Sequence, residues 1–128
     1  MHDDLFPKAT PEMSRKRASL APASTKAFRD FNREVFADGS LPSKTKQLIA
    51  VAVAHVTQCP YCIRGHTKQA ARVGATAEEL MEAVWVAAEM RAGAAYAHSA
   101  LMLDELGLLD DPGATDEEAS MRDAQPDD

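Results

Sequence analysis

Helical repetition of apolar residues is the feature that most constrains the fold of this 128-residue chain. Between Ser24 and Gly107, apolar side chains recur at intervals of three and four residues. No segment shows the alternation that is typical of a half-buried strand. The pattern therefore predicts an all-α fold, a compact bundle of about five to six helices, and a chain of this length suits one core better than two.

Turn and capping residues indicate where the helices begin and end. The first helix is expected after Ser24 and ends near Gly39. A second helix, apolar on most sides, is expected from residues 41–43 to Gln58, because Pro60 disfavours helical geometry in the residue before it. Pro60 suits the first turn of a third helix, which is expected to end at Gly74.

The remaining helical sequence is rich in alanine. Residues 76–79 match a capping box and predict the start of a fourth helix. A break or kink is expected near Gly93, and a last helical piece ends at Gly107. Eight of the residues 83–100 are alanine, which allows close approach of helices but supplies little bulk for a monomeric core. Together with the apolar second helix, this predicts a homo-oligomer.

Both ends of the chain differ from its centre in composition. Residues 1–22 are expected to form an irregular N-terminal arm, residues 23–108 the helical domain, and residues 109–128 an acidic, flexible tail. Eight acidic residues and one arginine follow position 109, so the tail accounts for the net charge of −6. The rest of the chain is nearly neutral and has no basic stripe, which argues against nucleic acid as a partner.

The sequence also bears on the cellular compartment. The longest uncharged apolar run, residues 48–54, is too short to span a membrane. Asp3 and Asp4 lie where a secretory signal carries basic residues. We therefore expect a cytoplasmic protein without a membrane partner, in which a Cys-x-x-Cys pair is more often catalytic or metal-binding than a structural disulfide.

Cys59 and Cys62 are the only cysteines, and His66 follows one helical turn after the second. If the helix begins at Pro60, Cys62 and His66 lie at i and i+4 on one face. Cys59 then lies at the helix N-terminus, where the backbone N–H groups favour a thiolate. This arrangement predicts thiol–disulfide chemistry, with a redox-active disulfide between Cys59 and Cys62, with His66 as the base, and with no metal or organic cofactor.

Two other interpretations of the same residues stay open. The cysteines could be buried and inert, although the joint occurrence of the spacing, the helix start and the histidine argues against this. His55 would complete a four-ligand set of the types that zinc prefers, so a non-catalytic zinc-binding or redox-sensing assembly module is an alternative. The long spacer of structural zinc sites is missing, however. Otherwise we expect His55 and Tyr61 to contact the substrate, with Tyr61 able to gate access.

Several segments resemble the AhpD-like branch of the carboxymuconolactone decarboxylase superfamily. The matching segments are residues 41–50, 54–62, 65–68, 83–88 and 91–98, within a resemblance that covers roughly residues 25–107. The resemblance implies an all-helical fold that assembles as trimers or hexamers. It also implies an alkylhydroperoxidase-type activity in which the dithiol cycles through a disulfide.

The motif of that branch, Glu-x11-Cys-x2-Cys-x3-His, can be transferred residue by residue. It implies that Cys62 reacts with the peroxide, that Cys59 resolves the product and exchanges with the reductant, and that His66 relays the proton. Position 47 has Gln47 in place of the glutamate. An amide cannot accept a proton at neutral pH, so the relay lacks a carboxylate unless Glu82 or Glu89 supplies one.

The sequence thus favours a thiol-dependent hydroperoxide reductase. Its substrate is expected to be a peroxide or a small-molecule disulfide, and an unknown dithiol reductant restores the thiols. A carboxymuconolactone-decarboxylase-like enzyme is a second enzymatic alternative, but the dithiol has no obvious task in that chemistry.

Overall fold

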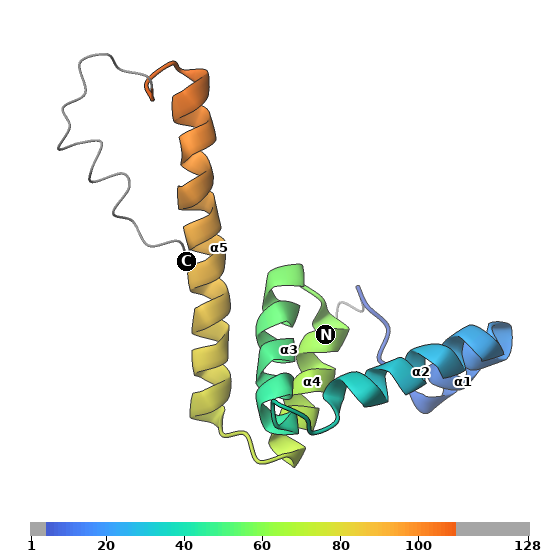
Figure 1. Cartoon of the computed structure of the whole chain (residues 1–128). Helices are drawn as coiled ribbons and strands as arrows, with labels where there is room; N and C mark the ends of the chain where they lie inside the picture. The colour runs from blue at the N-terminus through green and yellow to red at the C-terminus, as the bar shows by residue number, and fades with distance from the viewer. Residues whose placement is uncertain (1–4, 110–128) are drawn as a thin grey trace. The chain divides into compact units, whose positions relative to one another are not determined.

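The computed structural model describes residues 5–109, a range that contains helices and no strand. The helices are α1 (Pro11–Leu20), α2 (Pro22–Phe36), α3 (Ser43–Thr57), α4 (Pro60–Arg72) and α5 (Ala77–Glu105) (Figure 1). The all-α prediction is confirmed. The chain divides into two compact units at Glu89–Met90, and everything said of the site below concerns the first unit. Most of the predicted acidic tail, residues 110–128, lies outside the described residues.

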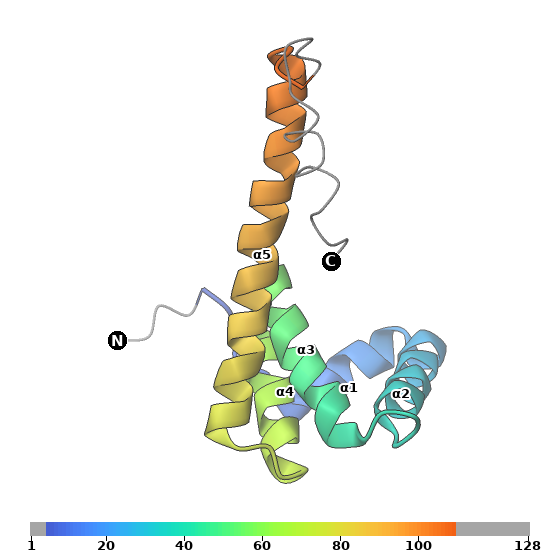
Figure 2. The ribbon, with the colours of Figure 1, turned by 60° about the vertical axis from the view of Figure 1, so that its left-hand side comes forward.

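Helices α3 and α4 form a hairpin that lies at the centre of the first unit. They run side by side in both views (Figures 1 and 2), and no other pair of helices packs together as extensively. Gln58, which follows α3, adopts the left-handed conformation with a φ of 57°. The Cys59 N–H then donates to the carbonyl oxygen of Ala54 at 3.2 Å, and Pro60 starts α4. The predicted ends of these helices at Gln58 and Pro60 are confirmed.

Small side chains allow α3 and α4 to approach each other closely. Val51 and Ala54 of α3 and Ala70 of α4 are buried, as is the polar side chain of Gln47. Helix α4 ends at Arg72, and Gly74 follows with a φ of +92°, a conformation that L side chains rarely adopt. The predicted role of Gly74 in ending this helix is therefore confirmed. The α3–α4 hairpin carries Cys59 at its turn and Cys62 in the first turn of α4.

The N-terminal part of the chain is more regular than the sequence indicated. Residues 11–20, expected to be irregular, form α1, so that expectation was wrong. The Thr10 side chain accepts a hydrogen bond from the Met13 N–H at 3.2 Å, and Pro11 lies in the first turn. Helix α1 has only three apolar residues, Met13, Ala18 and Leu20, which do not form a helical repeat from which it could be predicted. Helix α2 begins at Pro22 rather than after Ser24.

Helix α5 begins with the predicted capping box and then continues without interruption. The Glu79 N–H donates to Thr76 Oγ1 at 3.1 Å, and the Thr76 N–H donates to Glu79 Oε1 at 3.0 Å. Lys44 of α3 forms an ion pair with Glu79 at 2.8 Å. The helix passes through Gly93, so the expected break there was wrong, because the surrounding alanines favour the helix enough to accommodate one glycine.

Among residues 5–109, no helix combines the length and the hydropathy that a membrane span requires.

Candidate dithiol site

Cys59 is the residue that caps α4. Its backbone is extended, with φ −97° and ψ 106°, and its Sγ accepts a hydrogen bond from the Cys62 N–H at 3.3 Å. This geometry follows from the local sequence, because Pro60 can occupy the first helical position but cannot supply an N–H group. The cysteine therefore has the position predicted for it, at the positive end of the helix dipole.

The two sulfur atoms lie in direct contact. Cys59 Sγ and Cys62 Sγ are hydrogen-bonded at 2.7 Å, and both cysteines are free thiols. This hydrogen bond and the one from the Cys62 N–H lower the pKa of Cys59 below that of an ordinary thiol. The same hydrogen bond, together with burial, raises the pKa of Cys62. Cys59 is thus the more acidic thiol, as the position at the helix start predicted.

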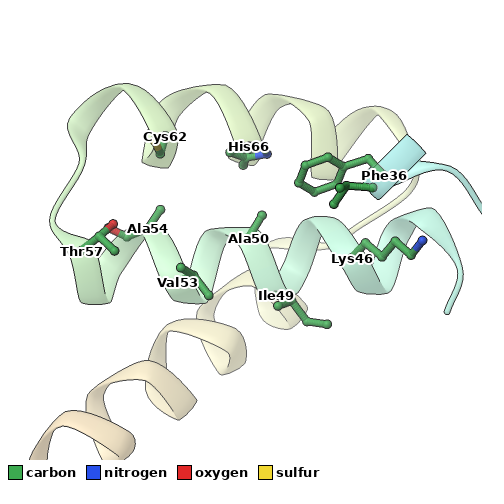
Figure 3. Close-up of a pocket in the computed structure, with 10 residues that line it drawn as sticks. Phe36, Lys46, Ile49, Ala50, Val53, Ala54, Thr57, Cys62 and His66 are labelled. Carbon is green, nitrogen blue, oxygen red and sulfur yellow. The ribbon is translucent and has the colours of Figure 1, made fainter. Parts of the chain in front are cut away.

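His66 lies one turn after Cys62 on the face of α4 that is turned toward α3 (Figure 3). Its Nδ1 lies 2.8 Å from Oε1 of the buried Gln47. Because a carbonyl oxygen accepts, Nδ1 carries the proton in this hydrogen bond, and in the neutral ring Nε2 is left as the proton acceptor. Gln47 therefore orients the histidine through an amide oxygen rather than through a carboxylate.

Phe36, the last residue of α2, contacts the imidazole ring of His66. Its ring is stacked on that of His66, with the centroids 5.0 Å apart and the planes inclined by 30°. Contacts with Gln47 of α3 and Phe36 of α2 thus restrain the ring from two helices. Phe36 lies in the helix that was predicted between Ser24 and Gly39, but its contact with the histidine was not predicted.

An apolar cavity of about 400 Å³ lies between α2, α3 and α4, and Cys62 and His66 form part of its wall (Figure 3). A cavity of this size is within the range that binds small molecules. It is lined by Val35, Phe36, Lys46, Ile49, Ala50, Val53, Ala54, Thr57, Cys62 and His66.

The two residues predicted to contact the substrate do not line this cavity. Tyr61 O–H donates to the carbonyl oxygen of Pro7, and the ring of Phe6 meets the tyrosine edge-on at 5.9 Å. His55 Nδ1 lies 2.7 Å from the carbonyl oxygen of Val51 on its own helix. Contact of Tyr61 and His55 with a substrate stays a prediction without support from the cavity.

Further residues considered from the sequence do not join the site either. Glu82 and Glu89, which were considered as a source of the missing carboxylate, do not line the cavity. The hydrogen-bond partner of His66 is the amide of Gln47. In the described part of the chain, no three His, Cys, Asp or Glu side chains are grouped so that they could hold a metal ion. The zinc interpretation therefore has no ligand set among these residues.

Comparison with known proteins identifies the family of this chain. The sequence profile of the carboxymuconolactone decarboxylase family matches residues 22–105. The chain belongs to this family. The matched region begins with α2 and ends with α5, so it contains every residue of the dithiol site.

Relatives of this family member have similar lengths. It is 58% identical over 113 residues to a protein of Paracoccus denitrificans named "Uncharacterized protein 4 in cox locus", covering 86% of this chain and 98% of the relative. An uncharacterized protein of Cupriavidus necator is 41% identical over 106 residues, covering 79% and 93%.

Solved structures of related proteins share the fold. A carboxymuconolactone decarboxylase family protein from Legionella pneumophila matches with a TM-score of 0.60 and 35% identity, over 62% of this chain and 70% of that one. A protein from Thermotoga maritima matches with a TM-score of 0.60 and 29% identity, over 83% and 98%.

Two residues that shape the dithiol site were not predicted from the sequence. Phe36 stacks on the histidine, and Lys46 lies at one end of the cavity. A signal existed for Phe36, because an apolar helix face that ends just before a turn must pack on something nearby. For Lys46 the only signal was its place beside Gln47, and neighbouring residues on a helix point in different directions.

Proposed function

We propose that this protein is a thiol-dependent peroxidase of the AhpD-like type, which reduces a hydroperoxide at Cys62 and forms a disulfide with Cys59. The observation that carries the proposal is the contact between the sulfur atoms of Cys59 and Cys62. Cys62 also lines an apolar cavity together with His66. A protein of this family from Thermotoga maritima is described as a candidate for a part in an antioxidative response, and removal of a peroxide would serve such a response.

The first step oxidises Cys62. Since the pKa of this thiol is raised, it needs a base, and we assign that role to Nε2 of His66, which lies one helical turn along α4 and lines the same cavity. The thiolate attacks the terminal oxygen of the hydroperoxide, so that an S–O bond forms and the O–O bond breaks. The imidazolium returns the proton to the leaving oxygen, and an alcohol is released. Cys62 is then a sulfenic acid.

The second step uses the more acidic thiol. Cys59, as a thiolate, attacks the sulfur of the sulfenic acid, an S–S bond forms, and hydroxide leaves and is protonated to water. Contact between the two sulfur atoms makes this step faster than a further oxidation of Cys62. A dithiol reductant then exchanges with the disulfide through Cys59, leaves as its own disulfide, and restores both thiols.

The proposal is tested by counting free thiols. Reduced protein treated with one equivalent of peroxide should lose two thiols per chain and recover them with a dithiol reductant. Cys62→Ser should abolish peroxide consumption, and His66→Ala should slow it by about 10²-fold or more, the range of general-base contributions. Peroxide consumption that persists in Cys62→Ser, or after alkylation of both cysteines, would contradict the proposal.

A further inference from the structure

The cavity beside the dithiol has a charged end that the proposed peroxidase chemistry does not use. Lys46 lines it at the end away from Cys62, with Phe36 and His66 between them (Figure 3). The Lys46 ammonium donates to the carbonyl oxygen of Ala37 at 2.6 Å, which leaves two of its three N–H groups for other acceptors. The other walls are apolar apart from Thr57 and the reactive pair.

No carboxylate in the described part of the chain neutralises this lysine. The ten residues that line the cavity include no acid, and none of the ion pairs found among residues 5–109 involves Lys46. Asp38, close by in sequence, accepts a hydrogen bond from the Ser43 N–H at 2.7 Å. The cavity therefore has an apolar wall and a single unneutralised positive charge, which favours an anionic ligand.

The length of the cavity follows from the helix that forms its floor. Lys46 and Ala54 are both on α3, eight residues apart, and Cys62 lies opposite Ala54 (Figure 3). At a rise of 1.5 Å per residue, Lys46 and Ala54 are about 12 Å apart along the axis of α3. A ligand that reaches both ends needs an extended apolar chain of medium length.

We propose that the cavity binds amphipathic anions, and that the preferred oxidant is a medium-chain aliphatic hydroperoxide with a carboxylate at the opposite end. The carboxylate pairs with Lys46, the chain lies against Ile49, Ala50 and Val53, and the hydroperoxide meets Cys62 and His66. The reaction itself is the one proposed above, so the choice of substrate depends on that function, whereas the binding of the anion does not.

Binding is measured first, without any peroxide, on the reduced full-length protein. Decanoate and 1-decanol have the same chain length and differ in the charge of the end group. By calorimetry we expect decanoate to bind about tenfold more tightly at low salt, a difference that decreases as salt screens the charge. Lys46→Met should remove the preference, and Lys46→Arg should retain it. Equal affinities in the wild type, or a preference that persists in Lys46→Met, would overturn the proposal.

Turnover is measured second, as a ratio within each protein. With 10-hydroperoxydecanoate and its methyl ester, kcat/KM should favour the acid by about tenfold in the wild type and by a factor near one in Lys46→Met. The ratio cancels any general effect of the substitution on folding. Lys46-dependent binding of decanoate in a protein that consumes no peroxide would leave the anion site standing and contradict the peroxidase. Peroxide consumption without preference for the acid would leave the peroxidase standing and contradict the anion site.

Discussion

At the scale of single residues, the amide at position 47 distinguishes this site from the motif that it resembles. Gln47 Oε1 accepts from His66 Nδ1 at 2.8 Å, so the tautomer that leaves Nε2 available is selected without a carboxylate. A neutral partner does not stabilise the imidazolium as a carboxylate would. The histidine is therefore well oriented but receives less electrostatic help when it holds the proton.

Gln47→Glu is expected to raise the rate of peroxide reduction. A buried carboxylate beside Nδ1 stabilises the imidazolium that forms when Cys62 loses its proton, and we expect a gain of several-fold up to about tenfold in initial rate. Gln47→Met is the matched control, since it retains the volume, removes the acceptor and should lower the rate. A rate in Gln47→Glu at or below that of the wild type would contradict this role for the acceptor.

The acidity of Cys59 depends on a hydrogen bond from Cys62, which can be tested by alkylation at different pH values. A lowered pKa means more thiolate at any pH below the usual thiol range, so the alkylation profile of Cys59 should lie at lower pH than that of an ordinary cysteine. In Cys62→Ser the hydroxyl can still donate to the sulfur. In Cys62→Ala that donor is lost, and the profile should move to higher pH. Identical profiles in the two variants would show that the donor has no effect.

At the scale of the helices, the turn between α3 and α4 determines where the dithiol lies. Gln58 has a φ of 57°, a left-handed conformation that costs free energy for any residue with a Cβ atom. This conformation allows Cys59 to follow directly as the cap of α4, so the strained residue lies next to the reactive one.

Gln58→Gly is expected to stabilise the fold by about 0.5–1 kcal/mol, because glycine adopts a positive φ without the steric cost. Gln58→Val should destabilise it by at least as much, since a β-branched side chain tolerates this region poorly. Urea unfolding followed by circular dichroism measures both. A lower urea midpoint for Gln58→Gly than for the wild type would show that the side chain has a stabilising role that outweighs the strain.

At the scale of the whole molecule, the first unit leaves large apolar side chains in contact with solvent. Phe28 is 67% exposed, Phe31 63% and Trp85 65%. Isolated soluble chains seldom expose so many aromatic side chains, and assembly of several copies would cover them. This supports the expectation of a homo-oligomer, which came from the apolar and alanine-rich helices.

Light scattering after gel filtration should therefore find a trimer or a hexamer rather than a monomer. Trp85→Glu should shift the population toward smaller species, because it would bury a charge at a subunit contact. Glu78→Gln, which alters charge on an exposed position of the same helix, is the control and should leave the size unchanged. A monomeric wild type at micromolar concentration would contradict the expectation.

The sequence by itself determined the features that depend on neighbouring residues. The ends of α3 and α4, the capping box of α5 and the place of Cys59 at a helix start follow from turn and capping chemistry, which acts over a few positions. The two wrong predictions have the same cause, because only neighbouring residues were considered. Helix α1 forms without an apolar pattern in its own sequence. Helix α5 continues through Gly93, although a glycine in a short segment indicates a break.

Only the tertiary structure decided which side chains meet across helices. Gln47 and His66 are 19 positions apart, and Phe36 comes from a third helix. Their contacts depend on which faces of α2, α3 and α4 pack together, and on small side chains such as Ala54 and Ala70 that set how closely the helices approach. The cavity and its lysine follow from that packing, because a space between helices has no signature in the spacing of residues along any one of them.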